Sequence, residues 1–224
     1  MKKLSIILIF FLFSSFAIAQ INKEKIDETL ISKGIDLKLN GYVITSQYTS
    51  KSNGVTHVYI RQTVNDIEIF NANSALHFDK NGNVITFNNS FVNNASSILI
   101  DSKNAINYTQ AVTNVAMQLG KKVIFSLAKS KNTSNEYVVV DKNASSKEIK
   151  AKMYYLLKNN QLLKVWNVEF YNDKTGDWWN KRVDVNTGKI IDENNWKTEC
   201  DTKKITKKVK KKIIFTSHSP KMSY

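Results

Sequence analysis

Histidine and cysteine are the side chains in this sequence with the greatest capacity to bind a metal or attack a substrate. The chain has three histidines, His57, His77 and His218, and one cysteine, Cys200. No two histidines lie within five residues of each other, and none is followed by glutamate. This spacing excludes the zinc motif His-Glu-x-x-His, in which two imidazoles hold the metal and the glutamate acts as general base. A single cysteine permits neither an internal disulfide nor a Cys-rich zinc module.

His57 and His77 lie in two neighbouring strand-like segments, where they could line a metal or acid-base site because neutral imidazole is a common ligand. We interpret both as ordinary sheet residues. Cys200 is a candidate for an inhibitory zinc ligand, because a thiolate binds Zn²⁺ well. A lone cysteine near a chain end is more often incidental. The sequence therefore predicts no catalytic residue, no metal site and no cofactor.

Three aspartates, Asp173, Asp177 and Asp184, suggest calcium binding. They lack the dense Asp/Asn/Gly loop ending in glutamate that an EF-hand requires, and turn formation accounts for Asp173.

Three tryptophans, Trp166, Trp178 and Trp179, could form a ligand platform. Valines flank Trp166 in a predicted strand, so we expect at least part of this cluster to pack in a core.

The first half of the chain reads as a short helix followed by strands. Residues 22–34 carry apolar positions at helical spacing and end at Gly34, which is typical of a helix with a glycine C-cap. Residues 42–92 are rich in β-branched and aromatic side chains and contain two tight-turn signals, Asn65-Asp66 and Asn81-Gly82. This segment predicts an antiparallel meander, and the Asn- and Ser-rich residues 93–104 predict a linker or long loop.

The second half repeats the pattern. Thr109 is a plausible N-cap for a helix over residues 110–119, with Gly120 just after its end. Further strand-like segments follow, joined by turn signals at Asn159-Asn160, 173–176 and 186–189. The sequence therefore predicts an α+β fold in which two antiparallel β-meanders are packed by one or two helices.

The first meander resembles the fungalysin/thermolysin propeptide motif, in which a Gly, a His-Val pair and a Gln precede an Asn-Gly-like turn, an apolar strand and a second turn. The residues that carry the resemblance are Gly54, His57, Val58, Gln62, Asn65, Phe70 and Gly82.

The second meander is similar to the PepSY-like half that follows in pro-regions of secreted fungalysin-type metalloproteases. It is matched by Trp166, Trp179, Val183, Asp184 and Gly188. The resemblance implies a propeptide/PepSY-like, cystatin-like fold with a first module at residues 20–100 and a second at 101–199. It also implies that the matched positions are structural.

The N-terminus has the three parts of a secretory signal peptide. Lys2 and Lys3 precede a largely apolar stretch over residues 4–16, and Ala17-Ile18-Ala19 follows. The stretch is shorter than the ~20 residues that span a bilayer, which argues against a membrane anchor. We expect residues 1–19 to be removed and the mature chain, without a transmembrane segment, to be secreted.

The formal charge of +14 is concentrated at the C-terminus. Residues 201–224 contain eight lysines and one aspartate, whereas the chain has only two arginines in total, Arg61 and Arg182. This distribution argues against nucleic-acid binding, which needs Lys and Arg clustered on one face with aromatic residues between them. We expect residues 200–224 to be a disordered or non-native tail, with binding to an anionic surface as the alternative.

The resemblance implies an interaction module without chemistry of its own. The chain is expected to assist folding of, and to inhibit, the catalytic domain of a secreted metalloprotease, in cis or in trans, as the remnant of a truncated precursor. Any zinc would belong to that catalytic domain. A standalone secreted protease inhibitor, or a protein that binds anionic surfaces through its tail, is the alternative.

Overall fold

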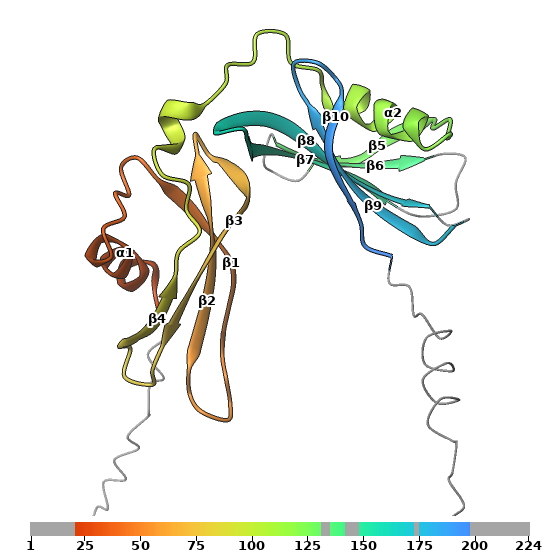
Figure 1. Ribbon diagram of the computed structural model, residues 1–224. Helices are drawn as coiled ribbons and strands as arrows, with labels where there is room; N and C mark the ends of the chain where they lie inside the picture. The colour runs from red at the N-terminus through yellow and green to blue at the C-terminus, as the bar shows by residue number, and fades with distance from the viewer. Residues whose placement is uncertain (1–20, 131–134, 142–147, 173–174, 198–224) are drawn as a thin grey trace, which may run out of the picture.

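The computed structural model describes residues 21–130, 135–141, 148–172 and 175–197, and Figure 1 shows the arrangement of their elements. Two α-helices, one 3₁₀ helix and ten strands make up this part of the chain. In chain order they are α1 (Lys23–Ser32), β1 (Gly41–Thr49), β2 (Thr56–Val64), β3 (Ile67–Phe78), β4 (Val84–Asn88), η1 (Ala95–Ile98), α2 (Tyr108–Gln118), β5 (Phe125–Ser130), β6 (Glu136–Asp141), β7 (Glu148–Lys158), β8 (Gln161–Asn172), β9 (Asp177–Asp184) and β10 (Ile190–Asn195).

The ten strands form one sheet rather than two separate ones. Its main path is β1-β2-β3-β7-β8-β9-β10, with β4 paired to β3 and the β5–β6 pair added to β7. All pairings are antiparallel except the contact between β3 and β7, where Ile69 lies opposite Tyr155 in a short parallel register. The predicted α+β class is confirmed, whereas the joining of the two halves by β3 and β7 was not expected. The cystatin-like description stays a prediction.

Side-chain caps fix the starts of both helices. The Asn22 side chain accepts a hydrogen bond from the Lys25 backbone N–H at 3.0 Å and caps α1. Helix α2 begins at a capping box in which Asn107 and Gln110 each bond the other's backbone. The prediction of Thr109 as N-cap was therefore wrong by two residues: Asn107 is the N-cap, and its side chain accepts from the Gln110 N–H.

The predicted hairpin turns have the backbone that their sequences favour. Asn65 and Asp66 have φ of 49° and 61°, and the Asn159-Asn160 turn is also left-handed at both positions. In the Asn81-Gly82 turn only Gly82 has positive φ, because Asp79 accepts the Asn81 and Asn83 N–H groups and sets a different turn.

A bulge in β3 keeps its buried side chains on one side of the sheet. Ile67 and Ile69 are buried before the bulge, and Leu76 and Phe78 are buried after it. Between them, Asn71 has φ of 65°, and the register with β2 shifts nearby. From the Arg61–Asn73 pair to the Thr63–Glu68 pair, β2 advances by two residues and β3 by five, and this odd excess keeps the two ends of β3 on the same face.

The helices cover the same side of the sheet. Ile26 and Leu30 of α1 pack against Val58, Ile60 and Leu76, whereas Ile31, which shared their helical spacing in the sequence, is exposed.

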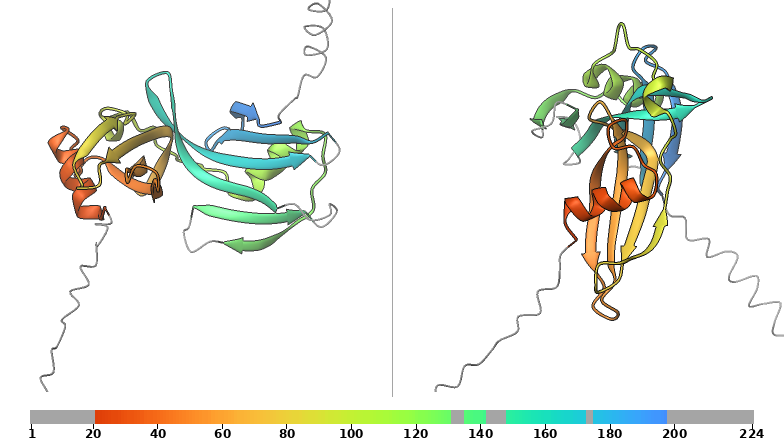
Figure 2. Two further views of the ribbon diagram at one scale, coloured as in Figure 1. Left: turned by 90° about the horizontal axis from the view of Figure 1, so that it is seen from below. Right: turned by 90° about the vertical axis from the view of Figure 1, so that its left-hand side faces the viewer.

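In the second half, α2 packs against strands β6 to β9, and Ala95 of η1 joins a cluster at the junction of the halves. Figures 1 and 2 show both helices on the outer side of the bent sheet. None of the helices in the described residues is long and apolar enough to cross a membrane.

A candidate docking surface on the helix-free face of the sheet

The side of the sheet opposite α1, η1 and α2 carries no helix within the described residues. We call it the helix-free face. Side chains alternate between the two faces along each strand, and residues paired across neighbouring strands point to the same face. The helix-free face is therefore made of the residues that alternate with those packed against the helices. It runs across both halves and includes Tyr48, His57, Tyr59, Arg61, Phe70, His77, Lys152, Tyr154, Trp178 and Arg182.

An aromatic and histidine cluster occupies the first-half part of this face. His57 and His77 are direct cross-strand neighbours, and their Nδ1 atoms lie 2.8 Å apart. The Tyr48 ring stacks on His57 at 4.9 Å, and the Tyr59 ring meets His77 edge-on at 6.2 Å. Partial burial, and to a smaller extent the neighbouring His57, lower the pKa of His77.

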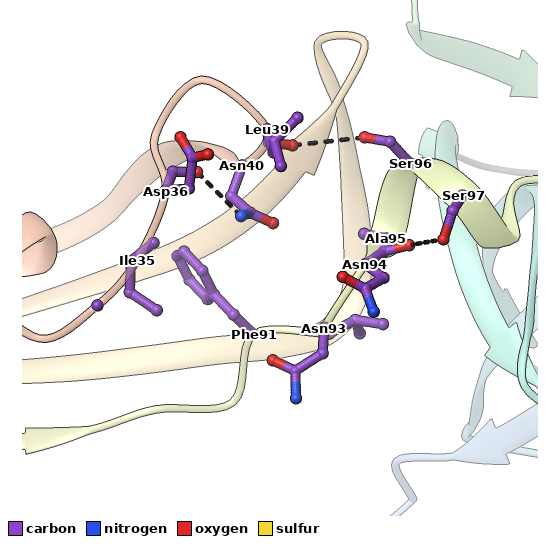
Figure 3. A pocket seen from close by; sticks show the side chains of 12 residues that line it. Ile35, Asp36, Leu39, Asn40, Phe91, Asn93, Asn94, Ala95, Ser96 and Ser97 are labelled. Carbon is purple, nitrogen blue, oxygen red and sulfur yellow. Dashed lines mark hydrogen bonds between the residues drawn. The ribbon is translucent and has the colours of Figure 1, made fainter.

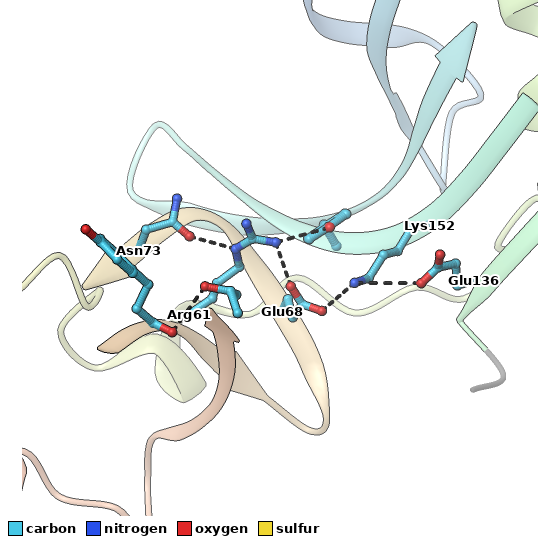
Figure 4. Close-up of polar contacts among 8 residues, drawn as sticks. Arg61, Glu68, Asn73, Glu136 and Lys152 are labelled. Atoms are coloured by element: carbon cyan, nitrogen blue, oxygen red, sulfur yellow. Dashed lines mark hydrogen bonds and ion pairs between the residues drawn. The ribbon is translucent and has the colours of Figure 1, made fainter. Parts of the chain in front are cut away.

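Charged side chains tie the two halves together at the centre of the face, as Figure 4 shows. Arg61 Nη1 donates to Glu68 Oε2 at 2.6 Å and to the Tyr154 hydroxyl at 3.2 Å, and its Nε donates to Asn73 at 2.7 Å. Lys152 Nζ donates to the other Glu68 oxygen at 2.5 Å. Burial alone would lower the pKa of Lys152, but the hydrogen bond from Lys152 to Glu68 and nearby negative charge outweigh it and raise the pKa.

A buried arginine completes the junction on the second-half side. Only 2% of Arg182 is exposed, and its guanidinium donates to the side chains of Asp192, Asn180 and Asn194 at 2.5 to 2.8 Å. The guanidinium carbon lies 4.7 Å from the ring centroid of Phe70, which comes from β3 in the other half. The charge is therefore fully paired and shielded.

Exposed aromatic rings mark the far end of the face. Trp178 and Trp196 are 46% and 49% exposed, and their ring centroids lie 5.8 Å apart. Tyr171 meets Trp178 edge-on. Tryptophan, tyrosine and arginine are the residues most enriched at energetically important positions of protein interfaces. The helix-free face therefore has the composition of a docking surface at both ends.

A cavity of about 500 Å³ lies on the other side of the first half, between the segment after α1 and the segment before η1. Figure 3 shows it lined by backbone and by Asp36, Asn40, Phe91, Asn94 and Ser96, among others. The sequence signals no chemistry at these positions, and within the described residues no group of three or more His, Cys, Asp or Glu side chains could hold a metal.

Gln62 explains how this cavity keeps its shape. Its buried amide donates to Asn40 Oδ1 at 2.7 Å and to the Val92 carbonyl at 3.0 Å, and accepts from the Val92 N–H at 2.6 Å. The side chain thus joins the segment before β1 to the segment after β4. This link between two segments is the structural role of Gln62 in the sequence motif.

The other first-half motif residues are spread over turns and both faces. Val58 lies in the α1 core, and His57 points to the opposite face. Gly54, Asn65 and Gly82 lie in three different turns, and Phe70 lies at the junction. The structure therefore does not gather the motif into a single site.

The second-half positions support the α2 core and the last turn. Trp166 and Val183 are buried against α2, and the Trp166 indole N–H donates to the Ile106 carbonyl at 2.9 Å. Trp179 is half-buried beside them, with Lys181 Nζ 4.2 Å from its ring centroid.

Asp184 and Gly188 shape the turn between β9 and β10. Asp184 Oδ1 accepts from the Thr187 N–H at 2.7 Å and from its hydroxyl at 2.8 Å. The Gly188 carbonyl accepts from Asn114 Nδ2 of α2 at 2.8 Å.

Several predicted features lie outside the described residues: the signal peptide at 1–19, Asp173, Cys200, His218 and the tail at 200–224. Asp177 and Asp184 lie at opposite ends of β9. Asp177 accepts a hydrogen bond from Asn195 of β10, and Asp184 accepts one from Thr187 in the following turn, so the two carboxylates do not share a calcium site.

Sequence reasoning missed the junction residues Glu68, Lys152, Tyr154 and Asp192. Charged residues within otherwise apolar strands were the one sign in the sequence that these positions form polar contacts. No local sequence pattern shows which charge in one half contacts which charge in the other.

Comparison with known proteins finds one matching family model and several similar proteins. Residues 40–91 match the family model described as the Fungalysin/Thermolysin Propeptide Motif. Extracellular metalloproteinase MEP of Fusarium vanettenii is 30% identical over 151 residues, which covers 66% of this chain and 23% of that protein. Extracellular metalloproteinase mep of Aspergillus niger is 31% identical over 139 residues, covering 60% of this chain and 22% of that protein.

The matched region thus spans under a quarter of the length of these curated relatives. The family model and the relatives together identify this chain as similar to the pro-region of fungalysin-type metalloproteases, with a fungalysin/thermolysin propeptide motif at residues 40–91.

Proposed function

We propose that this chain is a secreted pro-region module that binds the catalytic domain of a zinc metalloprotease, assists its folding and inhibits it. The observation that carries the proposal is the propeptide motif at residues 40–91, in a chain similar to proteins named extracellular metalloproteinases. The absence of His-Glu-x-x-His from the sequence agrees with a role in binding rather than catalysis.

The helix-free face is the surface that we assign to this contact. Its exposed rings, Tyr48, Trp178 and Trp196, offer large apolar area. Hydrogen bonds to Glu68 and Tyr154 hold Arg61 at the junction of the two halves. A partner that covers these rings removes them from water without first ordering flexible side chains.

Strand edges offer a second means of contact. β1 and β10 lie at the two ends of the main sheet path. An edge strand can pair through its main chain with an extended segment of a partner, while side chains set the specificity.

Binding alone accounts for both proposed effects. A module that binds the native catalytic domain and not its unfolded chain shifts folding toward the native state by RT ln(1 + [L]/Kd). If the two are joined in one polypeptide, the effective concentration of the module reaches roughly millimolar. The same contact excludes substrate when it covers the catalytic cleft.

The test is to add the purified chain to the catalytic domain of a fungalysin-type metalloprotease, once before refolding and once after. We expect a higher refolding yield in the first case and reversible inhibition in the second. No effect on either at large molar excess would overturn the proposal. Inhibition without any gain in refolding would favour a standalone inhibitor.

A further inference from the structure

The structure points to a metal site that the proposed function does not assign, on two residues of the helix-free face. We propose that His57 and His77 form a two-histidine site for a borderline divalent cation, Cu²⁺ or Zn²⁺. The proposal starts from their place on adjacent strands, where the Nδ1 atoms of the two rings face each other at 2.8 Å. Two nitrogens this close, on opposed rings, share either one proton or one metal ion.

The separation of the two nitrogens fits shared coordination. Imidazole nitrogens bind Zn²⁺ at about 2.0 to 2.1 Å, so two ligands of one ion lie about 2.9 Å apart at a right angle and about 3.3 Å apart in a tetrahedron. The two rings therefore need only a small opening, a few tenths of an ångström, to admit the ion. The rings are inclined at 73°, and metal binding requires small ring rotations that turn both Nδ1 lone pairs toward the ion and release the proton they share.

The surroundings hold both rings in place before any metal binds. Tyr48 stacks on His57, and Tyr59 packs edge-on against His77. The neighbours of the histidines along the strands, Val58, Leu76 and Phe78, are fully buried. The backbone that carries the rings is therefore anchored in the core, and binding orders little that is not already ordered.

The donor set selects the class of metal. Neutral imidazole suits Cu²⁺ and Zn²⁺, whereas Ca²⁺ and Mg²⁺ require oxygen ligands. Within the described residues no third His, Cys, Asp or Glu joins the pair. The site then keeps open positions for water on the helix-free face. We expect Cu²⁺ to bind more tightly than Zn²⁺, in line with the general order of divalent affinities.

The experiment is titration of the full chain with CuCl₂ and ZnCl₂, followed by calorimetry and by electron paramagnetic resonance of the Cu²⁺ form. We expect a one-to-one site whose spectrum shows two equivalent nitrogen ligands. His57→Gln and His77→Gln should each weaken Cu²⁺ binding at least tenfold. The matched control carries His218→Gln and Cys200→Ser, which removes the third histidine and the cysteine and should leave binding unchanged.

A measurement on the wild-type chain tests the proposal even if a variant fails to fold. In the wild-type chain, substoichiometric Cu²⁺ should broaden the ring resonances of His57 and His77 before that of His218. Broadening of His218 alone, equal affinity in the His57→Gln and His77→Gln variants, or no binding by the wild type would overturn the proposal. None of these results depends on a protease partner, so the site and the proposed function succeed or fail separately.

Discussion

Arg182 of β9 lies beneath Phe70 of β3, with its guanidinium carbon 4.7 Å from the centroid of the ring. The two residues come from different halves of the chain, and they meet where β3 and β7 pair in parallel. Arg61, Glu68 and Lys152 cross the same junction. These contacts fix how the aromatic ends of the helix-free face are placed relative to each other.

Replacing the buried arginine should destabilise the chain strongly. Arg182→Leu leaves Asn180, Asn194 and Asp192 without their shared donor. Because Asp192 is partly exposed and can regain water, we expect a loss of about 2 to 3 kcal/mol, below the 3 to 5 kcal/mol of a fully buried pair. Denaturant unfolding measures it. Lys189→Leu, on an exposed turn, is the control and should change stability by less than about 0.5 kcal/mol.

Gln62 should be nearly as sensitive, although it carries no charge. Gln62→Leu keeps the size of the side chain but removes three hydrogen bonds and leaves the Val92 N–H and the Asn40 side chain without these partners. An unsatisfied buried polar group costs about 1 to 3 kcal/mol. We expect a loss in that range by thermal and denaturant unfolding. Gln161→Leu, at an exposed position, provides the comparison; an equal loss there would contradict the structural role of Gln62.

A side chain at Gly188 should displace the Asn114 side chain, whose amide donates to the Gly188 carbonyl. Gly188 has φ of 69°, and a Cβ atom there would lie 2.9 Å from Asn114 Nδ2 of α2. Gly188→Ala therefore combines backbone strain with a clash. Gly120→Ala is matched in strain, with φ of 66°, but would meet nothing within 4 Å. We expect about 1 kcal/mol for Gly120→Ala and a clearly larger loss for Gly188→Ala. Equal losses would show that the Asn114 contact does not matter.

Acid should weaken the attachment of α1 to β1. Burial alone would raise the pKa of Asp27, but hydrogen bonds from Lys23 and Tyr42 outweigh it and lower the pKa below its usual 3.8. A carboxylate with a lowered folded pKa stabilises the fold above its unfolded pKa, and this stability is lost as pH falls through the folded value. Asp27→Asn should therefore flatten the decline in unfolding free energy below about pH 4.

Two further variants test whether Asp27 causes the loss of stability in acid. Tyr42→Phe removes the hydroxyl that donates to Asp27 and should flatten the acid decline in part. Glu28→Gln, on the exposed face of α1, should leave the decline as it is. An unchanged pH profile in Asp27→Asn would refute the linkage.

Local features of the fold could be predicted from the sequence because they depend on neighbouring residues. The Asn65-Asp66 hairpin follows from two residues that tolerate positive φ. The burial of Ile26 and Leu30 follows from helical spacing. The choice of Asn107 over Thr109 as N-cap did not follow, because both residues are good caps and their separation is within the usual error of helix ends.

The joining of the two halves could not be predicted in this way. The β3–β7 pairing rests on one short parallel register between Ile69 and Tyr155, which leaves no periodic signal. The bulge at Asn71 changes which side chains of β3 are buried, from the odd-numbered Ile67 and Ile69 to the even-numbered Leu76 and Phe78. The helix-free face depends on both features, so its extent across the two halves is visible only in the folded chain.

The most direct measurement of the central claim is the affinity of the chain for the catalytic domain of a fungalysin-type metalloprotease, by calorimetry. We expect one-to-one binding that Tyr48→Ala and Trp178→Ala each weaken at least tenfold. Met117→Ala, which changes an even more exposed apolar residue on the opposite, α2 side, should have no effect. Undetectable binding by the wild-type chain, or equal weakening by Met117→Ala, would contradict the account.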